Sequence, residues 1–290
     1  MVVLSALLLW VVGVQDAEPA APPPAEPFAP FASPAEESWF SLSPDGNTAV
    51  YGSHNADWGE HRVMMRRRLD RGWSDPQPVA IDGAPWPVEM RAMRFSPNGD
   101  QVVFSSAPLP GEARDDWDLW IAYWADGRLV APWRLPEPVN SSAHDFHASL
   151  AANGTVYFAS RRRGGEGGSD LYRAIPDMSV GWRVERLRTL STAQSEADIW
   201  IAPDESLAIL ARTDGADGFG GDDLYLAERR GEVWSEPVNL GAVINTPGYE
   251  YGAHGDLERG VLWFTSFREG SYSIYTTLMP GDESASEVSD

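Results

Sequence analysis

The chain has 290 residues, 43% of them hydrophobic and 11% aromatic, enough to bury the core of one large repeat domain or two ordinary domains. Its 43 acidic and 22 basic residues give a formal net charge of -21, whose field repels phosphates and argues against nucleic acid as a partner. The absence of cysteine excludes disulfides, thiolate metal sites and a cysteine nucleophile.

The chain opens with an apolar run, MVVLSALLLWVVGV, which is short for a membrane span and typical of the core of a signal peptide. No Lys or Arg precedes it and no clean A-x-A cleavage site follows it, so an uncleaved anchor is the alternative. We interpret residues 1–17 as a signal peptide or membrane anchor and expect a periplasmic or secreted protein. Membrane association is expected only through this segment, if it stays uncleaved. Residues 18–27 form a Pro/Ala-rich linker.

From residue 28 to residue 279, one order of features recurs five times at a spacing of about 53 residues. Each unit opens with a turn and a short β-rich run. These turns predict hairpins, because proline fixes one backbone angle and Gly or Asn tolerates a positive one. The openings are SPDGNTAVYGS from Ser43, SPNGDQVVFSS from Ser96, AANGTVYFAS from Ala151, APDESLAILAR from Ala202 and LERGVLWFTS from Leu257.

A Gly/Asp-rich loop then leads into another short strand, as in GGSDLYRAI and GGDDLYLAE. A polar turn and an extended stretch with proline follow, as in RGWSDPQPVA and GEVWSEPVNL. Proline there fits an outermost edge strand, where a missing N–H breaks no ladder. Because large aromatic residues usually serve burial, we expect the recurring tryptophans to cover the seams between units: Trp73, Trp133, Trp182 and Trp234.

Four strands per unit predict the blade of a β-propeller. The sequence therefore predicts an all-β fold, a single β-propeller of about five four-stranded blades over residues 28–279, followed by a disordered acidic tail over residues 280–290. The fifth unit ends without a fourth strand, whereas the segment AEPFAPFASPAEES resembles the fourth strand of other units. We predict that residues near Phe28 to Phe31 pair with the last blade and close the ring.

The SPDG and SPNG turns followed by VYGS and VFSS, the SRRRGGEGGSDLY loop and the WSEPVNLGAVINTPGYE exit resemble the TolB-type, WD40-like β-propeller repeat of bacterial envelope proteins. The resemblance spans about residues 37 to 278 as a repeat pattern. Members of this family include periplasmic docking proteins, propeller modules beside outer-membrane anchoring domains, and propellers attached to serine peptidases. The resemblance therefore implies the fold and leaves the function open.

An acidic residue recurs at the start of the first strand of each unit. The strand directions place the inter-blade exits and the Gly/Asp loops on one face, and function usually sits on loops held by a rigid scaffold. The carboxylates are interpreted as an electronegative ring that binds a cation, a basic peptide or an amine-bearing ligand. The alternative is that they bond to backbone N–H groups of adjacent blades. The five are Glu37, Glu89, Asp145, Glu196 and Glu250.

Two further features complete the predicted ligand-binding set. The run Arg161, Arg162 and Arg163 is suited to clamp a carboxylate, sulfate or phosphate of a partner, or it offsets neighbouring carboxylates. His144 lies beside Asp145 near the predicted channel mouth.

No metal or other cofactor is predicted. A spacing of three on a strand puts His144 and His147 on opposite faces, which disfavours a shared zinc site. Three aspartates that enter the third strands are expected to cap tight loops rather than bind calcium, which needs six or more oxygens: Asp118, Asp170 and Asp223.

Two functions follow from these patterns. The first is a non-enzymatic binding platform of the bacterial cell envelope, which holds a protein or polysaccharide partner on the face with the inter-blade and Gly/Asp loops. The alternative is a five-bladed glycoside hydrolase that uses channel-mouth carboxylates as acid and base. Catalytic carboxylates need different environments, so a catalytic pair should break the repeat rather than follow it. We predict no catalytic residue.

Overall fold

The computed structural model describes residues 24–31, 35–58, 61–82 and 89–280. The predicted signal peptide or anchor over residues 1–17, most of the linker and nearly all of the acidic tail lie outside these residues. Within them, no helix is long and apolar enough to cross a membrane.

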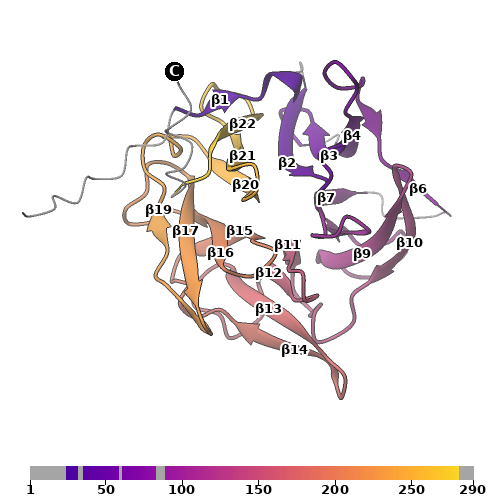
Figure 1. Ribbon diagram of the computed structural model, residues 1–290. Coiled ribbons are helices and arrows are strands. Elements are labelled where there is room, and N and C mark those ends of the chain that lie inside the picture. Colours follow the sequence, from indigo (N-terminus) through magenta and orange to yellow (C-terminus); the bar gives the residue numbers. More distant parts are fainter. Residues whose placement is uncertain (1–23, 32–34, 59–60, 83–88, 281–290) are drawn as a thin grey trace, which may run out of the picture.

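In the described part of the chain, five sheets, antiparallel except for one short outer strand, stand in a ring around a central axis (Figure 1). The innermost strand of each sheet contacts the innermost strand of the next, and the last contacts the first. The predicted five-bladed β-propeller is therefore confirmed. The inner strands of blades 1 to 5 are β2 (Glu36–Leu42), β7 (Met90–Phe95), β11 (Asp145–Leu150), β15 (Ser195–Ile201) and β20 (Glu250–Asp256).

The second and third strands follow outward in chain order within each blade. Second strands are β3 (Thr48–His54), β8 (Gln101–Ser106), β12 (Val156–Ser160), β16 (Leu207–Thr213) and β21 (Val261–Ser266). Third strands are β4 (Arg62–Arg67), β9 (Asp118–Ala125), β13 (Asp170–Asp177), β17 (Asp222–Arg230) and β22 (Ser273–Leu278). Blades 1 to 3 have the outer strands β5 (Gln77–Pro78), β10 (Arg128–Arg134) and β14 (Gly181–Arg186), and β6 (Ala80–Ile81) pairs parallel with β10. In blade 4, the short strands β18 (Val233–Trp234) and β19 (Val238–Asn239) both pair with β17.

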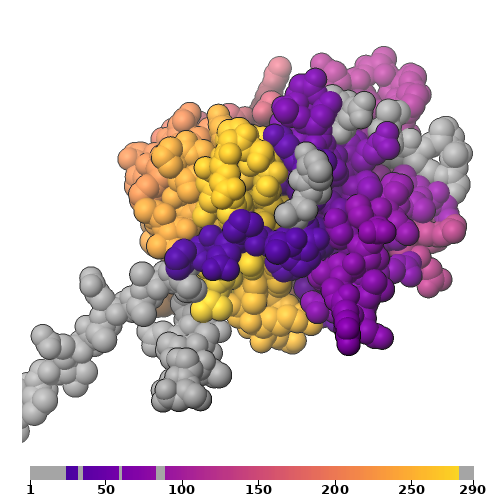
Figure 2. Space-filling model, turned by 90° about the horizontal axis from the view of Figure 1, so that it is seen from above, coloured from indigo at the N-terminus to yellow at the C-terminus, as the bar shows by residue number. Residues whose placement is uncertain are grey.

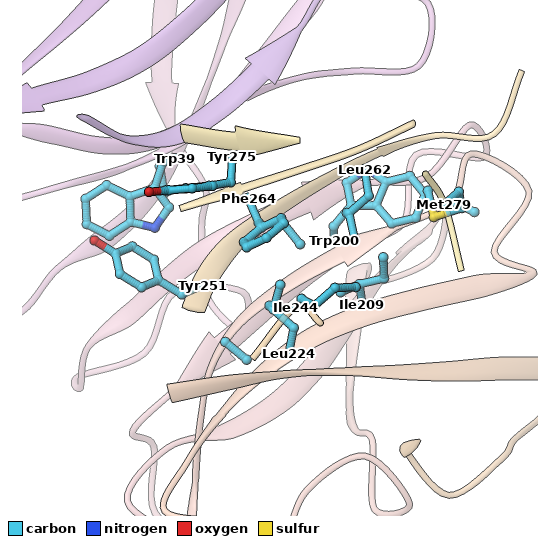
Figure 3. Packing of buried hydrophobic residues seen from close by; sticks show 14 residues of the cluster. Trp39, Trp200, Ile209, Leu224, Ile244, Tyr251, Leu262, Phe264, Tyr275 and Met279 are labelled. Carbon is cyan, nitrogen blue, oxygen red and sulfur yellow. The ribbon is translucent and has the colours of Figure 1, made fainter. Parts of the chain in front are cut away.

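Alternation along the strands explains how the blades stack. On β12, Val156 and Phe158 pack toward blade 2, whereas Tyr157 and Ala159 pack toward blade 4. Side chains point alternately to the two faces of a strand, so one run of apolar residues serves two seams. The described residues form five such hydrophobic clusters, one for each seam, and Figure 3 shows the seam between blades 4 and 5. The four recurring tryptophans lie in or against these clusters, as predicted.

The N-terminal segment closes the ring. Strand β1 (Glu26–Pro27) pairs antiparallel with β22, and the Phe28 N–H donates to the Ile274 carbonyl at 2.8 Å. The indigo segment in Figure 2 accordingly lies across the yellow last blade. The predicted closure is confirmed, with the pairing shifted slightly toward the N-terminus. The helical turn η1 (Ala29–Phe31) follows and buries Phe31 in the seam between blades 5 and 1.

Replacing Phe31 tests this closure. Its ring is 1% exposed and lies 5.3 Å from Phe40 and 5.0 Å from Tyr51, measured between ring centroids. Phe31→Ala is expected to lower the free energy of unfolding by about 3 to 5 kcal/mol, because it leaves a cavity in the seam. Urea denaturation measures the loss. Phe219→Ala, on a side chain 45% exposed, is the matched control and should change stability by less than about 0.5 kcal/mol.

Histidines near the channel make the fold sensitive to acid. Desolvation lowers the pKa of His254 to about 3 from 6.5, and the pKa of His61 likewise to about 3. The folded state therefore stays neutral where the unfolded chain takes up protons, so stability is present above pH 6.5 and is lost as pH falls toward 3.

We expect His254→Gln to lessen this acid sensitivity. The variant lacks the proton that the unfolded chain takes up at His254. The slope of the unfolding free energy against pH should therefore fall by about 1.4 kcal/mol per pH unit below pH 6.5. Urea denaturation of both proteins from pH 8 to pH 4 gives the two slopes, and the values at pH 8 control for lost packing. If the unfolding free energies of the two proteins change in parallel with pH over the whole range, His254 is not a source of the acid sensitivity.

Candidate binding site

Each inner strand carries a β-bulge at the same level of the channel. Three non-glycine residues there have left-handed backbone, with φ of 50° at Trp39, 50° at Ala92 and 51° at His147. Such φ values are strained for bulky residues. Hydroxyls of the preceding blades hold two of them: the Trp39 N–H donates to Thr265 Oγ1 at 3.0 Å, and the His147 N–H to Ser105 Oγ at 2.8 Å.

The bulges bring all five inner strands to one buried ion pair. Arg94 of β7 contacts Asp198 of β15, with Nη2 and Oδ1 2.5 Å apart and each side chain 3% exposed. Trp39 of β2 donates from Nε1 to the same carboxylate at 3.1 Å, and Arg94 also donates to the Ala253 carbonyl of β20. His147 of β11 lies 3.8 Å from Asp198 and contacts the Ala197 carbonyl through Nδ1 at 2.6 Å.

Next to this ion pair, a cavity of about 360 Å³ opens among the inter-blade and Gly/Asp loops. Its walls come from the inner strands of blades 1 to 5, from the start of β17, and from the loops that precede β4, β20 and β22. The lining residues are Trp39, Trp58, Arg91, His147, Ala197, Asp198, Asp222, Tyr249, Tyr251 and Tyr272. We call this space the channel-mouth cavity.

Four aromatic rings of the lining form a closed cycle of contacts. Between ring centroids, Trp39 lies 5.5 Å from Trp58 and 5.4 Å from Tyr251. Tyr272 completes the cycle at 5.4 Å from Trp58 and 5.8 Å from Tyr251. Figure 3 shows Trp39 and Tyr251 beside each other at one end of the seam. These distances are those of edge-to-face and tilted aromatic pairs, so the rings hold one another in place.

The polar groups of the cavity differ in their pKa shifts and in their hydrogen-bond partners. Burial raises the pKa of Asp222, whose carboxylate accepts a hydrogen bond from the Thr213 hydroxyl at 2.5 Å. Burial raises the pKa of Tyr251 well above 10, and its buried hydroxyl has no hydrogen-bond partner in the described structure. Burial also lowers the pKa of His147, which is neutral at pH 7. Arg91 forms an ion pair with Glu89 and lies 5.4 Å from the Trp58 ring centroid.

None of the five carboxylates predicted to form an acidic ring lines this cavity. Asp145, Glu196 and Glu250 are fully buried, and Glu37 is 2% exposed. The three fully buried carboxylates accept hydrogen bonds from the backbone N–H and the hydroxyl of the residue four positions earlier: Ser141 (2.6 and 2.8 Å), Thr192 (3.0 and 2.7 Å) and Thr246 (2.8 and 2.8 Å). They hold the loops that enter the inner strands.

The predicted arginine run does not act as one cluster. Arg162 turns inward, donates to the Ser160 hydroxyl at 2.8 Å and to Asp145 at 2.7 Å, and packs over Tyr172. Arg161 and Arg163 are exposed, and the Arg161 guanidinium lies 5.7 Å from the ring centroid of Phe146.

The remaining candidates lie in loops. His144 accepts the Trp117 N–H through Nδ1 at 3.1 Å, which holds the loop before β9. Asp170 and Asp223 accept backbone N–H groups of the loops before them, as expected of capping residues. Asp118 pairs with Arg114 and Arg134. Within the described residues, no group of three or more His, Asp or Glu side chains is arranged to hold a metal ion.

The cavity residues were not predicted, although a signal for them exists in the repeat. In four blades, the recurring acidic residue occupies the same position of the inner strand, and the residue two positions later lies at the bulge. That later residue is different in each of the four blades: Trp39, His147, Asp198 and Gly252. In blade 2 the aligned position holds Met90, so Glu89 stands one residue earlier. These exceptions to the repeat identify three residues that line the cavity: Trp39, His147 and Asp198.

Comparisons with solved structures agree with this fold. A putative TolB from Agrobacterium tumefaciens aligns with a TM-score of 0.53 and 13% identity over 82% of this chain and 72% of that one. TolB from Acinetobacter baumannii aligns with a TM-score of 0.49 and 16% identity over 86% of this chain and 56% of that one. The chain shares the fold of TolB-type propellers. No protein-family model and no curated protein matches the sequence.

A glucose dehydrogenase aligns with a TM-score of 0.50 and 11% identity over 88% of this chain and 99% of that one. Proteins of this fold therefore include an enzyme beside the TolB-type propellers. At these identities the likeness concerns the fold alone, so the function has to be argued from the site.

The central ion pair can be tested directly. Asp198→Asn is expected to lower the free energy of unfolding by about 3 to 5 kcal/mol, because Arg94 is then buried without a countercharge. Thermal and urea denaturation measure the change. Asp82→Asn is the control, since Asp82 and Arg128 form an ion pair at 3.1 Å with both side chains about half exposed; it should cost less than about 1 kcal/mol.

Proposed function

We propose that the protein is a non-enzymatic binding module of the bacterial cell envelope, which holds a protein or polysaccharide partner at the channel-mouth cavity. The observation that carries this proposal is the aromatic cycle around the cavity. Rigid aromatic residues at the mouth of a preformed pocket supply contact area at little entropic cost, which is typical of binding sites. The strained backbone at Trp39 and His147 supports the same location, because strain tends to persist at functional sites.

The envelope location is supported by two features. The fold is that of TolB-type propellers, and the apolar run within residues 1–17 is typical of a signal peptide or anchor. The cavity lies on the face with the longer inter-blade loops, where a large partner has access to it.

The glycoside hydrolase alternative has less support. It drew its acid and base from Glu89, Asp145, Glu196 and Glu250, and the last three are fully buried with partners inside the protein. Glu89 is 32% exposed at its side chain and pairs with Arg91. A catalytic pair has to contact the substrate, and these four carboxylates offer only one accessible member.

Binding measurements with a single ring removed test the proposal. The full chain captures its partner from envelope extract, and the purified partner is then titrated by calorimetry. Trp58→Ala should weaken binding by about tenfold or more, about 1.4 kcal/mol, because the ring forms one wall of the cavity. Tyr123→Ala, at a ring 49% exposed on β9, is the matched control and should bind like the original protein.

Two results would contradict this proposal. Unchanged affinity in Trp58→Ala, with its fold verified by circular dichroism, would place the partner elsewhere. Recovery of a cleaved partner, with the cleavage abolished by Asp222→Asn, would make the protein an enzyme.

A further inference from the structure

We propose that the group which anchors the ligand in the channel-mouth cavity is an alkylammonium cation, presented as a lysine-type amine or a quaternary amine. This inference rests on the proposed function and deepens it, because it names the chemistry that the cavity recognises. Three observations carry it: the aromatic cycle, the charge balance of the lining, and a buried tyrosine hydroxyl with no partner.

The aromatic cycle provides the walls that an ammonium group needs. The face of an aromatic ring is electronegative and attracts a cation within about 6 Å of its centroid, and tryptophan attracts it most strongly. Trp39, Trp58, Tyr251 and Tyr272 line one cavity and contact one another in a closed cycle. The Trp58 ring has the Arg91 guanidinium 5.4 Å from its centroid and is stacked on the His54 ring, with 3.6 Å between the ring centroids.

The charges of the lining leave one carboxylate without a countercharge. Asp198 is neutralised by Arg94, and Arg91 is neutralised by Glu89. His147 is neutral because burial lowers its pKa. Burial raises the pKa of Asp222, which has only the neutral Thr213 hydroxyl as a hydrogen-bond partner. Within the described residues, no ion pair joins Asp222 to a basic side chain. A single positive charge on the ligand balances this lining, whereas an anionic ligand adds to its charge.

The Tyr251 hydroxyl, which is itself buried, is the candidate for a directed contact with the ligand. Tyr251 is 7% exposed, lines the cavity, and has a hydroxyl without a hydrogen-bond partner. Leaving a buried polar group unpaired costs about 1 to 3 kcal/mol, so a ligand that donates to it recovers that cost. A primary ammonium carries N–H donors, whereas a quaternary ammonium carries none and depends on the ring faces alone.

Titration of the full chain with small cations tests the inference. Tryptophan fluorescence, supported by calorimetry, follows the binding of choline, of Nα-acetyl-lysine amide, and of 3,3-dimethylbutan-1-ol, which is the uncharged isostere of choline. We expect at least one cation to bind about tenfold more tightly than the isostere. Trp58→Ala and Asp222→Asn should each weaken that cation severalfold, and Tyr123→Ala should not.

The variant Tyr251→Phe distinguishes a lysine-type amine from a quaternary amine as the anchoring group. If the natural anchor is a lysine-type amine, this variant should weaken the lysine amide and leave choline unchanged, because only the lysine amide donates to the hydroxyl. If the anchor is a quaternary amine, choline should be the tighter ligand in both proteins. A general loss of fold would instead weaken both cations and lower the melting temperature, which circular dichroism measures.

Four outcomes would overturn the inference. Equal affinity for choline and its isostere would make the cavity a merely apolar pocket. Binding of neutral saccharides in place of both cations would make it a sugar site. Failure of every cation to bind, while Trp58→Ala still loses the envelope partner, would refute the ammonium anchor and leave the proposed function standing. If Trp58→Ala keeps its affinity for the envelope partner and for the cations, both the ammonium anchor and the proposed function are refuted.

Discussion

The Arg94–Asp198 ion pair at the axis is the contact on which the rest of the channel depends. Removing two charges from water is costly, and the pair is retained because its hydrogen bonds come from several blades at once. Trp39 and the Ala253 carbonyl contribute from blades 1 and 5, and His147 approaches from blade 3. Five strands that meet at one point need a bulge to reach it, which accounts for the common level of the bulges.

The ion pair also separates the two ends of the channel. Asp198 lines the channel-mouth cavity, whereas Arg94 lines a second cavity of about 320 Å³ among the turns that open the blades. The two spaces differ in chemistry, since the second is bordered by the SPDG-type turns and by apolar residues such as Leu150 and Trp200. Of these two spaces, only the channel-mouth cavity is lined by the aromatic cycle.

Positions that repeat from blade to blade and positions that vary have different roles in this chain. The acid at the start of an inner strand recurs where it fixes the entry loop, as Asp145, Glu196 and Glu250 do through the residue four positions earlier. The bulge position two residues later is released from that task and carries Trp39, His147 or Asp198. A site with one entrance needs different groups on its different walls, so it is built from the positions that do not repeat.

Turn chemistry and alternation with a period of two can be recognised in the sequence, and they sufficed to predict the blade count, the edge strands with proline, the seams under the tryptophans and the closure by the N-terminal segment. Only the tertiary structure decided which polar residues face the cavity. A carboxylate at the channel is accessible or buried according to the loop that folds over it, and Asp222 joins Trp39 and Trp58 only after the ring has closed. Those contacts join residues far apart in the chain, and no local pattern encodes them.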